Sequence, residues 1–170
     1  MEKLWSPWRS QYIDSFKFKN KEKGTECIFC NMKNENADDK KNLLIDKDKL
    51  TFTVLNLYPY NNGHLMIVPI RHTDNFITLT VKENQEIMFK LQLACKALKE
   101  VLKPDGYNIG ANLGKVSGAG IEEHVHFHIV PRWNGDTNFM PVLGEVKVIS
   151  QDLLSTKEKL REAYLKLMKN

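Results

Sequence analysis

The chain has 170 residues, of which 42% are hydrophobic and 27% are charged, and it carries a net charge of +4. This length suits one domain, and the composition is that of a globular protein rather than a fibrous or disordered one. No apolar run approaches the roughly 20 residues needed to cross a bilayer. We therefore expect no membrane insertion. The basic residues are mostly intermixed with acidic ones, so we expect no nucleic-acid binding either.

The first 30 residues combine an aromatic arm with a pair of cysteines. The opening segment MEKLWSPWRSQYI lacks an apolar signal core, which predicts a cytoplasmic location. We expect the arm to pack on the body or on a partner chain, because it carries large apolar groups: Trp5, Trp8, Tyr12 and Phe16. Cys27 and Cys30 then follow at the spacing of a zinc knuckle, although the same spacing also fits a redox pair. The polar residues 31–42 predict an exposed loop.

The middle of the chain predicts a hairpin and a long helix. Residues 50–60 alternate and are rich in β-branched and aromatic side chains, residues 61–63 (NNG) form a turn, and residues 64–70 read as a buried strand. Thr80 and Glu83 fit a capping box that begins a helix. Apolar residues follow at helical spacing until Pro104 and Gly106: Ile87, Leu91, Ala94, Cys95, Leu98 and Leu102.

The last third predicts a second strand pair and a terminal helix. Residues 107–114 and 124–130 read as strands joined through a glycine-rich loop, and Ser155 with Glu158 opens the helix. Tight connections within each strand pair favour an antiparallel sheet. We therefore predict an α+β fold with a long central helix and a C-terminal helix.

Three of the five histidines stand at alternate positions in the segment EEHVHFHIVPRW. On a strand, His124, His126 and His128 share one face, while the apolar residues between them face the core. This pattern allows three interpretations. The imidazoles are surface residues, or two or more of them bind a catalytic metal, or one of them attacks a phosphoryl group as a nucleophile.

The segment HVHFHIV resembles the signature of the histidine triad (HIT) superfamily of nucleotide hydrolases and transferases. The resemblance extends to VLNLYPYNNGHLMIVPIRH (54–72), and the segments LWSPWRSQYI and 110–142 are similar to the bacterial diadenosine tetraphosphate phosphorylase branch. The resemblance implies one HIT domain over residues 1–170. Within it, residues 1–30 form the arm and cysteine knuckle, and residues 146–170 form a C-terminal extension with a helix.

The resemblance also assigns roles to site residues. It implies that His126 is the nucleophile, that His128 contacts the phosphate and that His64 lines the same pocket. It places Asn56 at the ribose hydroxyls, where an amide can both donate and accept. It gives phosphate-side roles to Asn112 and to the loop before the triad, in which small residues let backbone N–H groups approach oxygens: Gly118, Ala119 and Gly120. Many hydrolases of the family have glutamine where this chain has Gly120, which favours phosphate over water as the acceptor.

In several similar proteins, two cysteines, a histidine after the second strand and the first triad histidine bind a structural zinc ion. The corresponding residues here are Cys27, Cys30, His72 and His124. Such a closed four-ligand site would anchor the N-terminal segment beside the catalytic strand. The resemblance implies no organic cofactor, and a divalent ion can accompany the polyphosphate of the substrate.

The expected activity is nucleotidyl transfer on a dinucleoside polyphosphate through a nucleotidyl-histidine, above all phosphorolysis of diadenosine tetraphosphate to ADP and ATP. The alternatives within the superfamily are hydrolysis of dinucleoside polyphosphates or of nucleoside phosphoramidates. The related hexose-1-phosphate uridylyltransferases have glutamine where this chain has His128, which argues against them. Outside the superfamily, a metal-dependent hydrolase and a non-catalytic nucleotide-binding module remain as alternatives. The resemblance also implies a homodimer joined through sheet edges.

Overall fold

The computed structural model describes residues 27–136 and 152–169. Its strands are β1 (Leu44–Lys47), β2 (Thr51–Leu55), β3 (Leu65–Pro69), β4 (Gly106–Gly110) and β5 (Phe127–Arg132). Its helices are α2 (Ile28–Met32), α3 (Val81–Leu102) and α5 (Leu153–Leu167), and two 3-10 turns are η1 (Phe76–Thr78) and η2 (Lys115–Ser117). The strands form one sheet in the order β1-β2-β3-β5-β4, with every neighbouring pair antiparallel. The predicted α+β fold with an antiparallel sheet is therefore confirmed.

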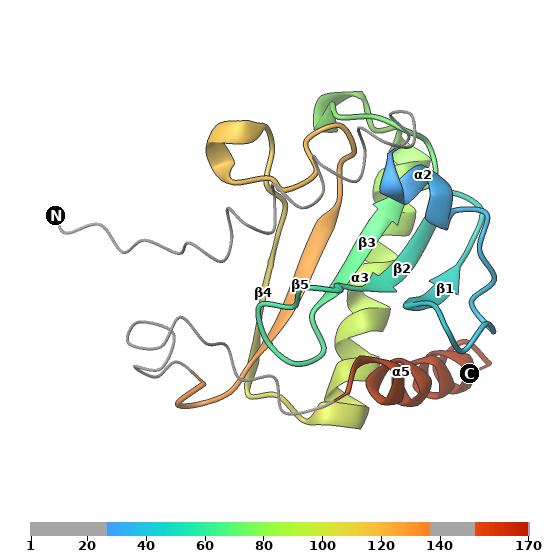
Figure 1. Ribbon diagram of the computed structural model, residues 1–170, viewed down its shortest axis with the longest axis vertical. Helices are drawn as coiled ribbons and strands as arrows, with labels where there is room; N and C mark the ends of the chain where they lie inside the picture. The colour runs from blue at the N-terminus through green and yellow to red at the C-terminus, as the bar shows by residue number, and fades with distance from the viewer. Residues whose placement is uncertain (1–26, 137–151, 170) are drawn as a thin grey trace, which may run out of the picture.

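The two faces of the sheet are covered by different helices (Figure 1). Side chains alternate between the faces along each strand. One set, which includes Leu55, Leu65 and Ile129, packs with residues of α3 and α5. The other set, which includes Phe52 and Met66, packs with the short helix α2. Because Met66 is paired with His128 across β3 and β5, the triad histidines lie on the face of α2, opposite the long helices.

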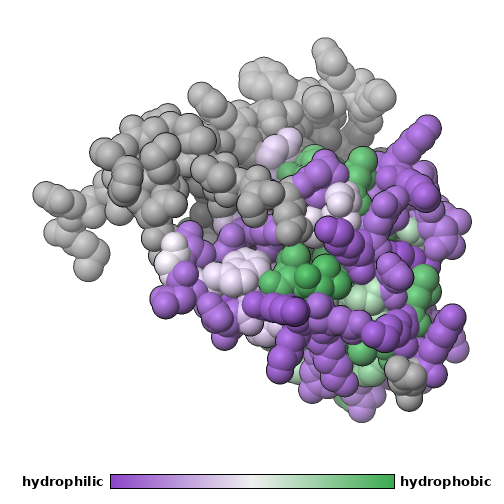
Figure 2. All heavy atoms as spheres, turned by 90° about the horizontal axis from the view of Figure 1, so that it is seen from below, coloured by the Kyte–Doolittle hydropathy of each residue, from purple (hydrophilic) through white to green (hydrophobic). Residues whose placement is uncertain are grey.

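Helix α3 begins at the predicted capping box. The Thr80 side chain accepts from the Glu83 backbone N–H, and the Glu83 carboxylate accepts from the Thr80 N–H. The helix ends where Lys103 adopts a left-handed conformation with φ of 49°. The side of the molecule seen from below in Figure 2 is mostly hydrophilic where it is described, with a smaller apolar patch. None of the helices in the described ranges is long and apolar enough to span a membrane.

The turn between β2 and β3 requires glycine. Gly63 has φ of +75°, a region that other residues enter only with strain. A Cβ atom at this position would also overlap the Leu102 side chain at the end of α3. The turn thus sits directly against the long helix, and this contact fixes where the next residue, His64, enters β3.

Several predicted elements differ in detail from the structure. The strand predicted at 107–114 is shorter and ends at Gly110, and the strand predicted at 124–130 begins only at Phe127. The predicted C-terminal helix is present as α5, but it begins at Leu153 with Asp152 as its cap, whose side chain accepts from the Ser155 backbone N–H, so the predicted start at Ser155 was too late.

The predicted exposed loop at 31–42 was wrong in part. Helix α2 extends to Met32, and Ala37 is buried against Phe52 and its neighbours. Strand β1 was not predicted. The aromatic arm, with Trp5 and Trp8, lies outside the described residues.

Candidate active site and metal centre

The three triad histidines face the α2 side of the sheet, although His124 and His126 precede the first residue of β5. Val125 between them is buried in the core on the opposite side, which preserves the predicted alternation. The rings of His126 and His128 have centroids 4.8 Å apart. His64, directly before β3, places its ring 5.1 Å from that of His128. Three imidazoles from the beginnings of two neighbouring strands therefore converge.

A backbone carbonyl determines which nitrogen of His126 can react. The distance from His126 Nδ1 to the His124 carbonyl oxygen is 2.8 Å, and since a carbonyl only accepts, Nδ1 carries the proton. In the neutral ring Nε2 then holds the lone pair. Burial lowers the pKa of His126, which keeps the imidazole neutral near pH 7. The ring is thus oriented and in the protonation state that a nitrogen nucleophile requires.

A second backbone group fixes the tautomers of His64 and His128. The Tyr60 N–H donates to His64 Nδ1 over 3.1 Å, so that nitrogen is an acceptor. In neutral His64 the proton then lies on Nε2, which donates to His128 Nδ1 over 2.9 Å. By the same reasoning, neutral His128 carries its proton on Nε2. The Tyr60 ring packs on both imidazoles, with centroids 4.7 Å and 5.8 Å away. His128 therefore carries a fixed N–H donor beside the His126 ring.

Two cavities meet at these histidines. One, of about 200 Å³, is largely apolar and is lined by His126 and His128. Its other lining residues come from α2, β2 and the loop before β5, including Ile28, Phe29, Leu55 and Ile121. The other, of about 400 Å³, is more polar and lies toward β4 and the end of β5. Tyr60, Asn112 and His128 line both cavities. The boundary between a nonpolar and a polar compartment thus falls at the histidine cluster.

The other predicted substrate-binding residues divide into two groups. Asn56, Asn112 and Gly120 line the apolar cavity. The Asn56 side chain also accepts from the Tyr58 N–H over 3.0 Å and reaches His64 Nδ1 over 3.3 Å. Gly118 and Ala119 line neither of these two cavities: Gly118 ends η2 in a left-handed conformation, and Ala119 is buried.

The four predicted metal ligands come together. The potential ligand atoms of Cys27, Cys30, His72 and His124 all lie within 4.8 Å of one another. Cys27 Sγ is 3.3 Å from His124 Nδ1, and Cys30 Sγ is 3.3 Å from His72 Nδ1. Tetrahedral zinc with ordinary bond lengths separates sulfur and nitrogen ligands by about 3.6 Å. Burial raises the pKa of the Cys27 thiol to about 11, so a cation is needed to stabilise its thiolate. The donor set and its spacing fit zinc.

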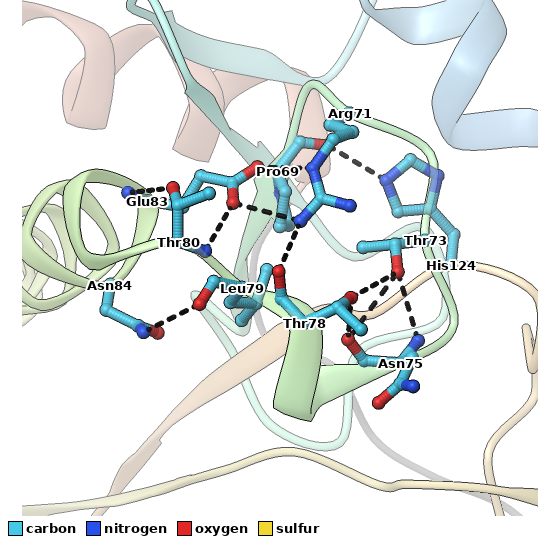
Figure 3. Close-up of polar contacts among 10 residues, drawn as sticks. All are labelled: Pro69, Arg71, Thr73, Asn75, Thr78, Leu79, Thr80, Glu83, Asn84 and His124. Atoms are coloured by element: carbon cyan, nitrogen blue, oxygen red, sulfur yellow. Dashed lines mark hydrogen bonds and ion pairs between the residues drawn. The ribbon is translucent and has the colours of Figure 1, made fainter.

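The orientation of His124 also suits a metal ligand. Its Nε2 lies 2.8 Å from the Pro69 carbonyl and therefore carries the proton, which leaves Nδ1 for the cysteine side (Figure 3). Phe29, between the two cysteines, contacts the ring of His124 at 5.5 Å and that of His126 at 5.1 Å. The metal cluster and the candidate nucleophile are therefore joined through one buried aromatic ring.

The loop that carries His72 is clamped to the start of α3. Arg71 donates to both carboxylate oxygens of Glu83, at 2.8 Å and 3.0 Å, and also to the Thr78 carbonyl (Figure 3). The Glu83 carboxylate, with 5% of the side chain exposed, thereby joins the helix cap to the loop. The Arg71 guanidinium holds the pKa of Glu83 down to about 2. The Thr73 carbonyl then accepts from the Val125 N–H over 2.7 Å, which connects the loop to the triad segment.

Some residues of the site were not predicted. Phe29 and Tyr60 contact the histidines, and their only signal in the sequence is proximity to Cys27, Cys30 and His64. Arg132, which the sequence left without a role, forms an ion pair with Asp136 over 2.6 Å. A four-residue spacing on a loop gives no indication of such a contact, because it depends on the turn at Gly135.

Comparison with known proteins agrees with this geometry. A family model described as the HIT domain matches residues 37–135. A protein of Mycobacterium tuberculosis named AP-4-A phosphorylase is 39% identical over 163 residues, which cover 94% of this chain and 83% of the relative. Bis(5'-adenosyl)-triphosphatase of Saccharomyces cerevisiae is 38% identical over 88 residues, covering 51% of this chain and 42% of the relative.

The solved structures lead to the same family. The chain is similar to a Zn-bound histidine triad family protein from Mycobacterium smegmatis, with a TM-score of 0.67 and 26% identity over 85% of this chain and 96% of the other. The family model covers more than half of the chain, and the tuberculosis relative extends over nearly all of it. The chain therefore belongs to the HIT, or histidine triad, family.

Proposed function

We propose that the protein transfers a nucleotidyl group from a dinucleoside polyphosphate through a covalent bond to His126, and that its main reaction is phosphorolysis of diadenosine tetraphosphate to ADP and ATP. One observation carries the proposal. His126 lines the apolar cavity, and its Nδ1 proton is held by the His124 carbonyl, which leaves the lone pair of the neutral ring on Nε2. The cavity suits a nucleoside, and the nitrogen suits attack on its α-phosphorus.

The first half-reaction forms the bond to histidine. His126 Nε2 attacks the α-phosphorus, the N–P bond forms, and the P–O bond to the leaving nucleoside polyphosphate breaks with its electron pair going to that oxygen. In this mechanism His128, whose neutral ring carries a proton on Nε2, donates to the phosphate oxygens as charge develops. Asn112 and Gly120, which line the same cavity, supply further polar contacts on the phosphate side.

The second half-reaction releases the nucleotide. An oxygen of inorganic phosphate attacks the α-phosphorus, the N–P bond breaks, and His126 recovers its lone pair while ADP leaves. If water attacks instead, the product is AMP. Gly120 stands where many hydrolases of the family have glutamine, and this difference favours phosphate. The cycle needs no organic cofactor and no catalytic metal.

The relatives support this choice. The tuberculosis protein named AP-4-A phosphorylase is matched over nearly the full length of this chain, whereas the yeast triphosphatase is matched over about half. Hydrolysis of dinucleoside polyphosphates is therefore the second candidate. A hydrolase in which all three triad histidines hold one metal is disfavoured, because His124 directs Nδ1 to the cysteines while His126 donates Nδ1–H to a carbonyl.

We also propose that Cys27, Cys30, His72 and His124 hold a structural zinc ion. A similar solved structure is described as Zn-bound. When bound, zinc would stabilise the thiolates and anchor the segment that carries Phe29 beside His126. We further propose that residues 1–170 form one domain and that the protein is a homodimer. A cytoplasmic location stays a prediction.

Product analysis tests the proposal directly. Diadenosine tetraphosphate is incubated with the protein, with and without inorganic phosphate, and the nucleotides are separated by ion-exchange chromatography. We expect ADP and ATP in equal amounts when phosphate is present. AMP and ATP in both conditions would show that the reaction is hydrolysis and not phosphorolysis. No turnover in either condition would contradict the proposed substrate.

A further inference from the structure

The larger, polar cavity has no role in the reaction as derived so far. It is about 400 Å³ in volume, which lies in the range of ligand sites, and it continues from His128 along the same face of the sheet toward Arg132. Residues 128, 130 and 132 of β5 share that face and form its floor, and Asn108 and Gly110 of β4 form one side. The cavity is thus built on two paired strands.

Its far wall is held by a closed network of hydrogen bonds. The Asp136 carboxylate accepts from Arg132 Nε and Nη2 at 2.6 Å and 2.7 Å, from Asn61 Nδ2 at 2.8 Å and from the Trp133 N–H at 3.1 Å. Asn61 also donates to the Pro131 carbonyl. The network ties the turn after β2 to the end of β5 and thereby braces this wall of the cavity.

The walls carry more polar groups than those of the apolar cavity, and their charge is balanced. Arg132 and Asp136 neutralise one another, and they are the two charged groups in the described lining apart from the histidine. Arg132 Nη1 donates to Asn108 Oδ1 over 2.8 Å, which leaves the Asn108 amide nitrogen with its two N–H groups for a ligand. Amide donors on a neutral surface suit a sugar and base better than a bare polyphosphate chain.

The position of the cavity relative to the nucleophile identifies what would occupy it. His126 lines the apolar cavity, which the proposed function assigns to one nucleoside, and the polar cavity adjoins it through the shared residues His128, Tyr60 and Asn112. A substrate whose α-phosphorus lies at His126 extends its leaving group across that boundary. We infer that the polar cavity between β4 and the Arg132–Asp136 pair is the subsite for the second nucleoside of a dinucleoside polyphosphate, an inference that rests on the proposed function.

Two glycines on β4 provide a matched pair of variants for a test. Gly110 pairs with His128 and lines the cavity, whereas Gly106 pairs with Arg132 and is not among its lining residues. A Cβ atom at either glycine would meet nothing within 4 Å, and neither has a positive φ, so both accept a side chain without strain. Gly110→Leu should fill the cavity, and Gly106→Leu is the control. Asn108→Ala removes a donor without filling it.

Binding is measured by calorimetry with two probes: AMP, which has one nucleoside, and the diadenosine tetraphosphate analogue with methylene bridges, which has two. We expect Gly110→Leu to weaken analogue binding at least tenfold and Asn108→Ala about threefold to tenfold, with AMP affinity within twofold of wild type throughout. Gly106→Leu should change neither. Unchanged analogue binding in Gly110→Leu, or an equal loss for AMP, would overturn the inference.

The same experiment separates this inference from the proposed function. If Gly110→Leu selectively weakens analogue binding as expected but wild type turns over no dinucleoside polyphosphate, the subsite stands and the proposed reaction is wrong. If wild type turns over the substrate yet the Gly110→Leu substitution has no effect on analogue binding, the reaction stands and the subsite is wrong. If neither probe binds wild type, both are wrong.

Discussion

At the scale of single residues, main-chain carbonyls determine which ring nitrogen each histidine presents. The His124 carbonyl accepts a hydrogen bond from Nδ1–H of His126, and the Pro69 carbonyl accepts one from Nε2–H of His124. Neighbouring histidines thereby present opposite nitrogens, one toward the apolar cavity and one toward the cysteines. A row of identical side chains acquires two different chemical roles through its hydrogen bonds.

The alternation of the triad could be predicted because it follows from the two-residue repeat of extended backbone. The roles of individual nitrogens could not. They depend on Pro69 and Tyr60, which the fold brings to the histidines from β3 and from the turn before it. The pairing of Arg132 with Asp136 could not be predicted either, because it also depends on how the folded backbone brings the two side chains together.

The metal cluster gives a prediction at this scale. Cys30→Ser should abolish stoichiometric zinc, because Cys30 Sγ lies 3.3 Å from His72 Nδ1 and 3.9 Å from His124 Nδ1. Metal content per chain is measured by inductively coupled plasma mass spectrometry after purification without added chelator. Cys95→Ser is the control, since this third thiol lies on α3 away from the cluster. A full equivalent of zinc in Cys30→Ser would refute the ligand assignment.

At the scale of elements, sequence patterns predicted what is long and regular. The capping box predicted the first residue of α3, and the apolar spacing predicted that the helix continues from there. The hairpin of β2 and β3 followed from alternation around the NNG turn. Helix α2 has five residues and β1 has four, which is too short for a periodicity to be recognised. Both are stabilised by tertiary packing: α2 by Phe29 against Phe52, and β1 by pairing with β2.

The junction of β3 and α3 gives a prediction about pH. The pKa of Glu83 falls from 4.5 to about 2 in the folded protein, so the unfolded chain binds the proton more readily. Its contribution to stability is present above about pH 5 and is lost as the pH falls toward 2. Glu83→Gln should lower the free energy of unfolding at pH 7 by about 2 kcal/mol, and the difference from wild type should shrink at pH 3.

Urea denaturation at both pH values measures this effect. Glu158→Gln is the control, because Glu158 faces Lys40 at 3.8 Å on an exposed surface and should matter much less at either pH. A difference between Glu83→Gln and wild type that stays constant from pH 7 to pH 3 would show that the ion pair with Arg71 is not its source.

At the scale of the whole molecule, the two edges of the sheet differ. Strand β1 is short and its pairing with β2 shifts register between Leu44 and Asp46, an irregularity that protects edges. Strand β4 forms the other edge and exposes 51% of Ile109. The proposed dimer therefore joins through β4 rather than β1. Such an assembly would bring two active sites near one interface, since β4 also borders the cavity at His128.

A charge at this edge tests the dimer. Ile109→Lys should convert it to a monomer, because a lysine on an edge strand opposes pairing with a second edge. Sedimentation velocity gives the mass of each variant in solution. Ile77→Lys places the same charge on a residue that is 89% exposed in η1 and should leave the mass unchanged. A monomeric wild type, or a dimer that survives Ile109→Lys, would contradict this interface.

The most direct test of the account is the chemical state of His126 during turnover. The protein is mixed with diadenosine tetraphosphate in the absence of phosphate, quenched within milliseconds in alkali, which preserves phosphoramidates, and examined by intact and peptide mass spectrometry. We predict one adenylyl group per chain on His126, absent in His126→Ala and lost within a turnover when phosphate is added. Product formation with no adduct at any time, or an adduct that persists in His126→Ala, would contradict a covalent mechanism at this residue.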